Sequence, residues 1–155
     1  MNKTTKWHLA QLNVGKMTGA SIDDPAMAGF VALLDEINTV AEASKGFIWR
    51  LKDENNNATS LNPFGDERIL VNMSVWETVD DLEAYVYSGR HLDVLKSRRD
   101  WFVKFGKPFM ALWYIAAGHI PTVEEARERL DHLQRNGPTA YVFDFNVRFA
   151  APAEE

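Results

Sequence analysis

The stretch ILVNMSVWETVDD, residues 69–81, decides the fold. Its first eight residues alternate, so that Leu70, Asn72, Ser74 and Trp76 form a polar and aromatic face opposite an apolar face of Ile69, Val71, Met73 and Val75. A period of two is typical of a β-strand, because successive side chains point to opposite faces of the sheet. Thr78 with Asp81 resembles a capping box that has Asp in place of Glu, which predicts a helix directly after the strand.

Similar patterns predict the other elements of the chain. Strands are expected at 7–14, 47–51, 68–76 and 109–116, and helices at about 25–44, after Thr78, and from 121 to about 136. Asp24-Pro25 is typical of a helix start and Gly46 of a helix stop. The order β-α-β-β-α-β, followed by one more helix, predicts the ferredoxin-like α+β fold with an antiparallel sheet. Residues 141–149 are either a fifth strand or an arm that lies on a partner chain.

Composition limits the classes of function. The chain has 155 residues, 46% of them hydrophobic and 25% charged, which suits a single domain over 1–155 with its core at about 7–145. The net charge of −5 and the lack of a basic block argue against nucleic-acid binding. With no cysteine, disulfides and thiolate metal sites are excluded. We see no signal peptide and no apolar run of about 20 residues, so we expect a cytoplasmic protein without a membrane segment.

The stretch SGRHLDVLKSRRDWF, residues 88–102, contains the strongest candidates for chemistry. Placed on one helix, His91 and Arg98 fall in the middle of an apolar arc formed by Val94, Leu95, Trp101, Phe102 and Phe105. His91 is a satisfied core residue, a pocket acid–base group, or a haem ligand. Arg98 forms a buried structural salt bridge or binds an anion, and Arg50 is a second candidate for the anion. No HExxH motif or close histidine pair predicts a metal site.

The two faces of the sheet suggest a binding surface. Right-handed crossovers place both helices of the ferredoxin-like unit on one face, and we expect the mixed face to be left uncovered. Asn13 and Asn72 lie on that mixed face and either bond across strands or bind a substrate carbonyl or oxyanion. Trp76, Trp101 and Trp113 are core residues or stack on a flat ligand. A partly polar cavity covered by a partner chain predicts a homodimer that packs sheet against sheet.

Several stretches carry a family resemblance: HLAQLNVG, DDPAMAGFVALLDEIN, GFIWRL, LVNMSVWETVDDLEAYVY, ALWYIAAGHIPTVEEARERL and GPTAYVFDF. Over about residues 8–145 the chain resembles an uncharacterised bacterial family of the dimeric α/β-barrel superfamily. That superfamily includes cofactor-free quinone-forming monooxygenases of antibiotic biosynthesis and haem proteins such as chlorite dismutases. VNMSVWETVDDLEAYVYSGRH is similar to the strand-then-helix pattern of these monooxygenases, and spheroidene monooxygenase resembles the chain more distantly.

Three functions remain open from the sequence. The first is a small monooxygenase-like oxidoreductase without a cofactor, which acts on a flat apolar or phenolic molecule. In it, His91 moves a proton, Arg98 or Arg50 stabilises the resulting anion, and tryptophans hold the ring. The second is haem binding or haem-dependent chemistry through His91. The third is a non-catalytic ligand-binding or structural dimer.

Overall fold

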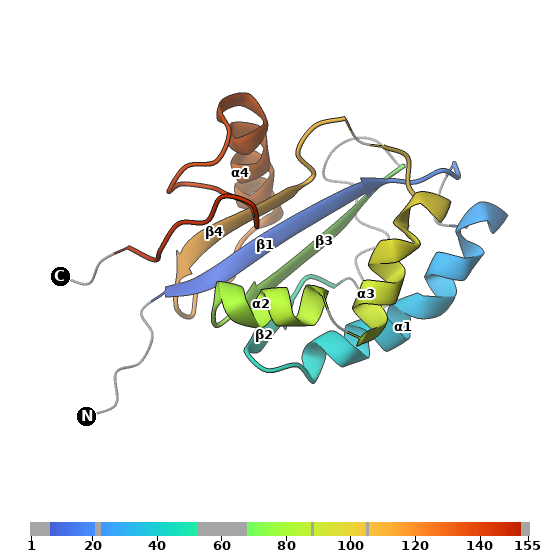
Figure 1. Ribbon diagram of the computed structural model, residues 1–155, viewed down its shortest axis with the longest axis horizontal. Helices are drawn as coiled ribbons and strands as arrows, with labels where there is room; N and C mark the ends of the chain where they lie inside the picture. Colours follow the sequence, from blue (N-terminus) through green and yellow to red (C-terminus); the bar gives the residue numbers. More distant parts are fainter. Residues whose placement is uncertain (1–6, 21–22, 53–67, 88, 105, 153–155) are drawn as a thin grey trace.

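Four strands form one antiparallel sheet in the order β2-β3-β1-β4 (Figure 1). The computed structural model describes residues 7–20, 23–52, 68–87, 89–104 and 106–152, and only the backbone of residues 90, 91, 94, 95 and 99. The strands are β1 (Trp7–Lys16), β2 (Phe47–Arg50), β3 (Ile69–Trp76) and β4 (Met110–Ala116). This order, with antiparallel pairing between all neighbours, confirms the predicted ferredoxin-like α+β sheet.

Three of the helical elements begin directly after predicted capping residues. The helical elements are α1 (Ala28–Glu42), which follows the 3-10 turn η1 (Pro25–Met27), then α2 (Val79–Val86), α3 (Gly89–Lys96), the 3-10 turn η2 (Arg98–Asp100) and α4 (Val123–Asn136). The side chains of Asp24, Thr78 and Thr122 each accept a hydrogen bond from a backbone N–H of the first turn. None of the described helices has the length and apolar character of a membrane span.

The stretch 88–102 does not form the single helix that we expected. Helix α3 ends at Lys96, and Arg98 belongs to the separate turn η2. Steps of one regular α-helix therefore do not extend from His91 to Arg98, because a 3-10 turn begins at Arg98. That His91 and Arg98 share one face stays a prediction, because the His91 side chain lies outside the described residues.

The register of β1 with β3 separates two chemically different faces. Ala10 lies opposite Val75 and Leu12 opposite Met73 on the first, which we call the apolar face. Gln11 lies opposite Ser74, and Asn13 opposite Asn72, on the other, which we call the polar face. Helix α4 packs on the apolar face through its buried side chains Ala126, Leu130 and Leu133.

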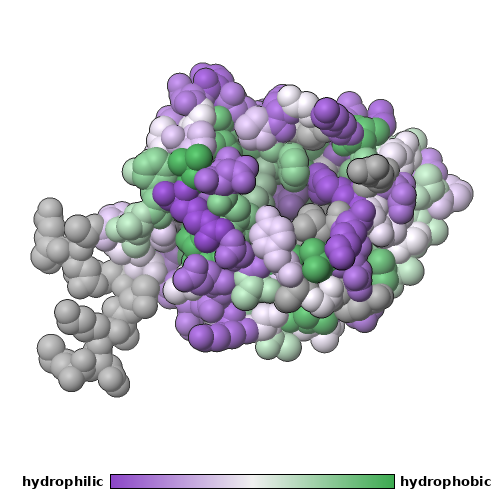
Figure 2. All heavy atoms as spheres, in the orientation of Figure 1, coloured by the Kyte–Doolittle hydropathy of each residue, from purple (hydrophilic) through white to green (hydrophobic). Residues whose placement is uncertain are grey.

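Helices α1, α2 and α3 lie on the polar face, on the near side of the sheet in Figure 1. Leu82 of α2 packs against Trp76, and Phe30 of α1 packs against Phe102. The Tyr85 hydroxyl of α2 donates to the Ile37 carbonyl of α1 at 3.2 Å. The expectation that helices leave the mixed face uncovered is therefore wrong, because α1 and α2 pack on parts of it. Figure 2 shows mixed hydrophilic and hydrophobic side chains over this side of the molecule.

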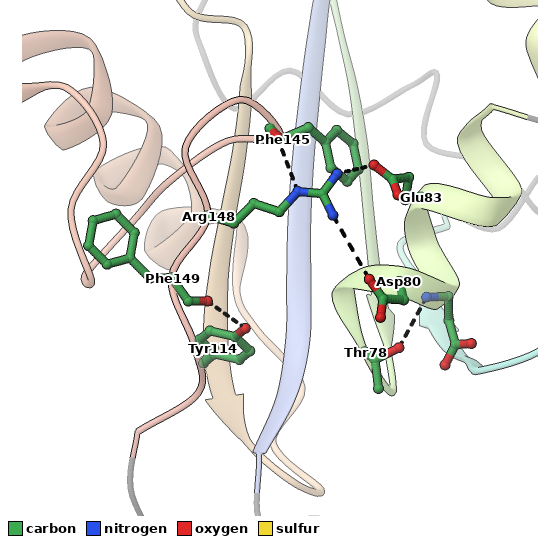
Figure 3. A network of polar contacts seen from close by, with 8 residues as sticks. Thr78, Asp80, Glu83, Tyr114, Phe145, Arg148 and Phe149 are labelled. Carbon is green, nitrogen blue, oxygen red and sulfur yellow. Dashed lines mark hydrogen bonds and ion pairs between the residues drawn. The ribbon is translucent and has the colours of Figure 1, made fainter.

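Residues 141–149 fold onto the chain's own sheet. Phe143 exchanges two backbone hydrogen bonds with Leu112, of 2.8 and 2.9 Å, in an isolated bridge at the outer edge of β4. Figure 3 shows the rest of the attachment: the Arg148 guanidinium pairs with Glu83 and lies 3.9 Å from Asp80, both of α2. The Tyr114 hydroxyl donates to the Phe149 carbonyl at 2.8 Å. The segment is thus a strap held by one chain, neither a full fifth strand nor an exchange arm.

Replacing Phe143 by Ala tests this attachment. The side chain is 0% exposed, so its loss should lower the free energy of unfolding by about 3–5 kcal/mol. Val147→Ala, at a position 48% exposed, is the matched control and should change it by less than about 0.5 kcal/mol. Denaturant unfolding measures both, and equal values for the two variants would contradict the strap.

Candidate functional site

Two asparagines occupy the middle of the polar face. Asn13 of β1 and Asn72 of β3 lie directly opposite each other on the two central strands. Asn72 is exposed and Asn13 half-buried, although buried clusters around Trp76 and around Phe102 lie on either side. Central strands are normally the best covered part of a sheet face. The two amides are thus accessible between these clusters, and we call the region around them the open middle.

Helix α1 is tied at both ends to neighbouring parts of the chain. One end is fixed by Phe30 against the Trp101 and Phe102 rings, and the other by the hydrogen bond from Tyr85 to the Ile37 carbonyl. Between these contacts Leu33 and Leu34 are only half-buried, and Ala41 is the helix's one buried residue. The helix therefore keeps half-buried leucines between two fixed ends.

A buried hydrogen-bond network supports the amide pair from one side. The Gln11 Nε2 donates to Asn72 Oδ1 at 2.7 Å and to Ser74 Oγ at 2.8 Å. The Trp76 Nε1 donates to the same Ser74 oxygen at 2.8 Å. Gln11 and Ser74 are 5% and 7% exposed, so the network excludes water and holds Asn72 in one orientation.

Trp76 and Arg50 are already engaged by the chain itself. Trp76 is 1% exposed, stacks on Tyr85 with 5.2 Å between ring centroids, and receives the edge of Phe47. Arg50 is 6% exposed and donates through Nε to Glu42 Oε2 at 3.1 Å. Burial raises the pKa of Tyr85, and the nearby Arg50 charge opposes that rise, so the phenol stays neutral. Of the two roles that the sequence left open for Trp76, the structure shows the core residue, and the Arg50 cation, a candidate for anion binding, pairs with Glu42.

Arg98 and Trp101 lie at the far end of β1. Arg98 Nη2 donates to the Val14 carbonyl at 3.4 Å, and its guanidinium lies 4.4 Å from the Phe109 ring centroid and 5.1 Å from that of Phe102. No carboxylate among the described residues pairs with Arg98, and burial lowers its pKa. An arginine still keeps its proton at neutral pH. A cation that no described carboxylate compensates is therefore held one residue beyond Asn13.

Glycine at position 15 is required for this end of the site. A Cβ built there would lie 2.7 Å from Cδ1 of Phe102, closer than real contacts allow. The ring of Phe102 lies directly on the strand as a result, and Arg98 stacks on that ring. A side chain at Gly15 would displace both.

The backbone of His91 belongs to α3, but its side chain lies outside the described residues. Its predicted roles in proton transfer or as a haem ligand therefore stay predictions. Within the part of the chain that the structure describes, no group of three or more His, Asp or Glu side chains could hold a metal ion.

Trp113 lies on the apolar face, away from the amide pair. It is 0% exposed and donates through Nε1 to Glu125 Oε2 of α4 at 2.9 Å. The other Glu125 oxygen lies 2.8 Å from His119 Nε2. This placement corrects the expectation that Trp113 lines the same site, because its ring fixes α4 to β4.

A groove of about 630 Å³ also lies on the apolar side, beside α4. Its lining combines apolar and oppositely charged side chains: Val14, Ile69, Lys107, Glu124, Arg127, Glu128, Leu130, Asp131 and Gln134. The residues that we predicted for the site do not line this groove, so it is separate from the amide pair.

Sequence reasoning did not assign Gln11 and Ser74 to the site. Alternation placed both on the mixed face, but only the register brings Gln11 opposite Ser74 and one pair away from Asn72. A run of three polar side chains on adjacent central strands was the available signal, since buried polar groups need partners.

Comparison with known protein families identifies the family of the chain. The model of the family described as a domain of unknown function (DUF3291) matches residues 8–155. The chain belongs to the DUF3291 family. This confirms the predicted membership of an uncharacterised family. A search of proteins with curated functions finds no match to this DUF3291 chain.

Solved structures similar to the DUF3291 chain share little sequence with it. Rv0793 from Mycobacterium tuberculosis is 14% identical, with 74% of this chain and 99% of that one covered at a TM-score of 0.47. A protein of unknown function from Nitrosomonas europaea, NE2512, is 11% identical, with coverages of 77% and 99% and a TM-score of 0.47. SnoaB from Streptomyces nogalater, described as a cofactor-independent oxygenase, is 14% identical, with coverages of 73% and 95% and a TM-score of 0.44.

Replacing Ser74 by Ala tests the buried network. The change removes the acceptor for both the Trp76 and the Gln11 N–H, so unfolding free energy should fall by about 1–3 kcal/mol. Ser97→Ala is the control, because that hydroxyl makes no cap hydrogen bond, and it should change the value by less than about 0.5 kcal/mol. Equal stability of wild type and Ser74→Ala in denaturant unfolding would contradict the network.

The link between Glu125 and Trp113 predicts a pH dependence. Although desolvation by burial raises the pKa of Glu125, hydrogen bonds from His119 and Trp113 outweigh it and lower the pKa below its usual 4.5. A lowered pKa stabilises the fold above the unfolded value, and this contribution is lost as pH falls through the folded value. Glu125→Gln should therefore be less stable than wild type at pH 6, and this difference should shrink at pH 3.5. A difference in unfolding free energy that is the same at both pH values would argue against the link.

Proposed function

We propose that the chain binds a flat phenolic molecule over the amide pair and oxidises it with molecular oxygen, without a cofactor. One observation carries the proposal. Asn13 and Asn72 are left accessible in the middle of a face that is otherwise covered, with the Arg98 cation one residue beyond Asn13. Accessible polar groups on a rigid, largely apolar surface are the features that orient a small ligand.

The chemistry needs a substrate that gives an electron to oxygen itself. For a naphthalenediol, loss of a hydroxyl proton gives a phenolate, which passes one electron to O₂ and forms a ring radical and superoxide. The two combine at a ring C–H carbon to a hydroperoxide, which loses water and leaves a carbonyl. One oxygen atom thus ends on the ring and the other in water, and the diol becomes a hydroxyquinone.

The protein's part in this reaction is to bind the ring and stabilise its anion. The amides of Asn13 and Asn72 hydrogen-bond the oxygen on which charge develops, and Arg98 adds positive potential at the same end of β1. Half-buried Trp101 and the α1 leucines hold the ring. His91 moves the proton in this scheme, as the sequence suggested.

We propose a homodimer as well, on the basis of the superfamily resemblance. Because helices cover the polar face, two chains would have to meet through other surfaces. A sedimentation mass of about twice 17.6 kDa at micromolar concentration supports the dimer, and a mass of 17.6 kDa rules it out.

Binding and turnover of naphthalene-1,5-diol test the function. Asn13→Ala and Asn72→Ala should each raise the calorimetric Kd by roughly fivefold to tenfold, since each removes about one net hydrogen bond. Asn146→Ala, at an exposed position outside the polar face, is the control and should leave the Kd unchanged. Oxygen consumption with one hydroxyquinone formed per O₂ supports the monooxygenase reaction.

Two results would contradict the proposal. The first is an unchanged Kd in both asparagine variants, which would move the ligand away from the open middle. The second is a sharp Soret band on adding haemin that disappears in His91→Ala. That result would favour the hypothesis of haem binding through His91 over a cofactor-free reaction.

A further inference from the structure

In the hydrogen-bond network on the polar face, Gln11 donates to both of its side-chain partners, Ser74 and Asn72. An indole N–H can only donate, so the Ser74 oxygen must accept from Trp76 Nε1, which lies 2.8 Å away. That oxygen also accepts from Gln11 Nε2 at 2.8 Å. Ser74 Oγ thus accepts from both residues, and the Gln11 amide turns its nitrogen toward Ser74.

The network continues from Gln11 to Asn72. The second hydrogen of Gln11 Nε2 goes to Asn72 Oδ1 at 2.7 Å, so both donors of that nitrogen are used. Gln11 is 5% exposed, so its amide is shielded from water while it pairs with Ser74 and Asn72. If Asn72 reversed, two N–H groups would face each other with no acceptor between them.

The oxygen of the Asn72 amide is therefore used in a hydrogen bond within the chain, and its nitrogen is available to a ligand. Its oxygen is taken by Gln11, whereas its nitrogen has no hydrogen-bond partner among the described residues and belongs to an exposed side chain. The open middle accordingly receives N–H donors from Asn72. The Arg98 guanidinium, also a donor without an acceptor side chain among the described residues, lies at the end of the same strand.

We infer that Gln11 is a positioning residue that holds the Asn72 amide so that a ligand over the sheet meets its N–H donors. This rests on the proposed function, because it assumes that the ligand lies over the amide pair. Gln11 itself is buried and touches no ligand. It makes the open middle selective for an oxygen acceptor, such as a carbonyl or a phenolate, over a ligand that presents an N–H.

Two flat, uncharged tricyclic probes of nearly equal shape measure this selectivity. Fluorenone offers a carbonyl acceptor and no donor, and carbazole offers an N–H donor and no comparable acceptor. The quantity measured is the ratio of their calorimetric Kd values in each variant. In wild type, fluorenone should bind more tightly, by on the order of tenfold, the factor of one net hydrogen bond.

Substitutions of Gln11 should change the ratio in a fixed order. Gln11→Met removes the donor that holds the Asn72 amide in one orientation, and it should bring the ratio of the two Kd values close to one. Gln11→Glu places an acceptor against Asn72, turns the Asn72 nitrogen inward, and should favour carbazole. Gln134→Glu is the matched control, because that glutamine donates to the Pro108 carbonyl beside α4, and it should keep the wild-type ratio.

The outcomes separate this inference from the proposed function. If Gln11 has only a structural role, Gln11→Met and Gln11→Glu should weaken the binding of both probes equally and leave the ratio of their Kd values unchanged. That result would overturn the inference and not the proposed function. Asn72→Leu should abolish the preference for fluorenone. If wild type binds neither probe, or Asn72→Leu binds both as wild type does, the proposed site itself fails and the inference fails with it.

Discussion

The pairing register of β1 and β3 is the constraint on which the rest of the structure depends. It aligns Ala10 and Leu12 with Val75 and Met73 on one face, and Gln11 and Asn13 with Ser74 and Asn72 on the other. A slip of one residue would bury the amides against α4 and expose the aliphatic side chains. Both the core and the candidate site thus follow from one alignment of two central strands.

Polar side chains on the polar face are accommodated in two ways, by hydrogen bonds to each other or by access to solvent. Toward Trp76, the side chains of Gln11 and Ser74 satisfy each other, and aromatic rings close over them. Toward Arg98, the Asn13 and Asn72 amides remain accessible instead. The buried Gln11–Ser74 network is rigid, whereas the Asn13–Asn72 pair is accessible. Through the hydrogen bond from Gln11 to Asn72, the buried network positions the accessible pair. The strap at residues 141–149 closes the Trp76 end, since Phe143 packs in the same cluster.

Much of the fold could be predicted from the sequence. Alternation identified the strands, and the caps at Asp24, Thr78 and Thr122 fixed the helix starts, because these signals depend on neighbouring residues only. The face that the helices cover could not be predicted, since an apolar strand face attracted the amphipathic α4 and left the mixed face to α1–α3. The helical wheel over 88–102 failed where α3 ends at Lys96. Burial of Trp76 and Trp113 depends on long-range packing that no local pattern contains.

The most direct test of the account is the hydrogen exchange of side-chain amides, measured by NMR with and without fluorenone. The account predicts that the Gln11 side-chain amide exchanges its hydrogens slowly and that its resonances do not shift when the ligand is added. The Asn13 and Asn72 amides should exchange fast, and their resonances should shift when the ligand is added. A protected Asn72 amide with no shift on adding the ligand, together with shifts at Leu130 and Gln134 in the groove beside α4, would contradict it.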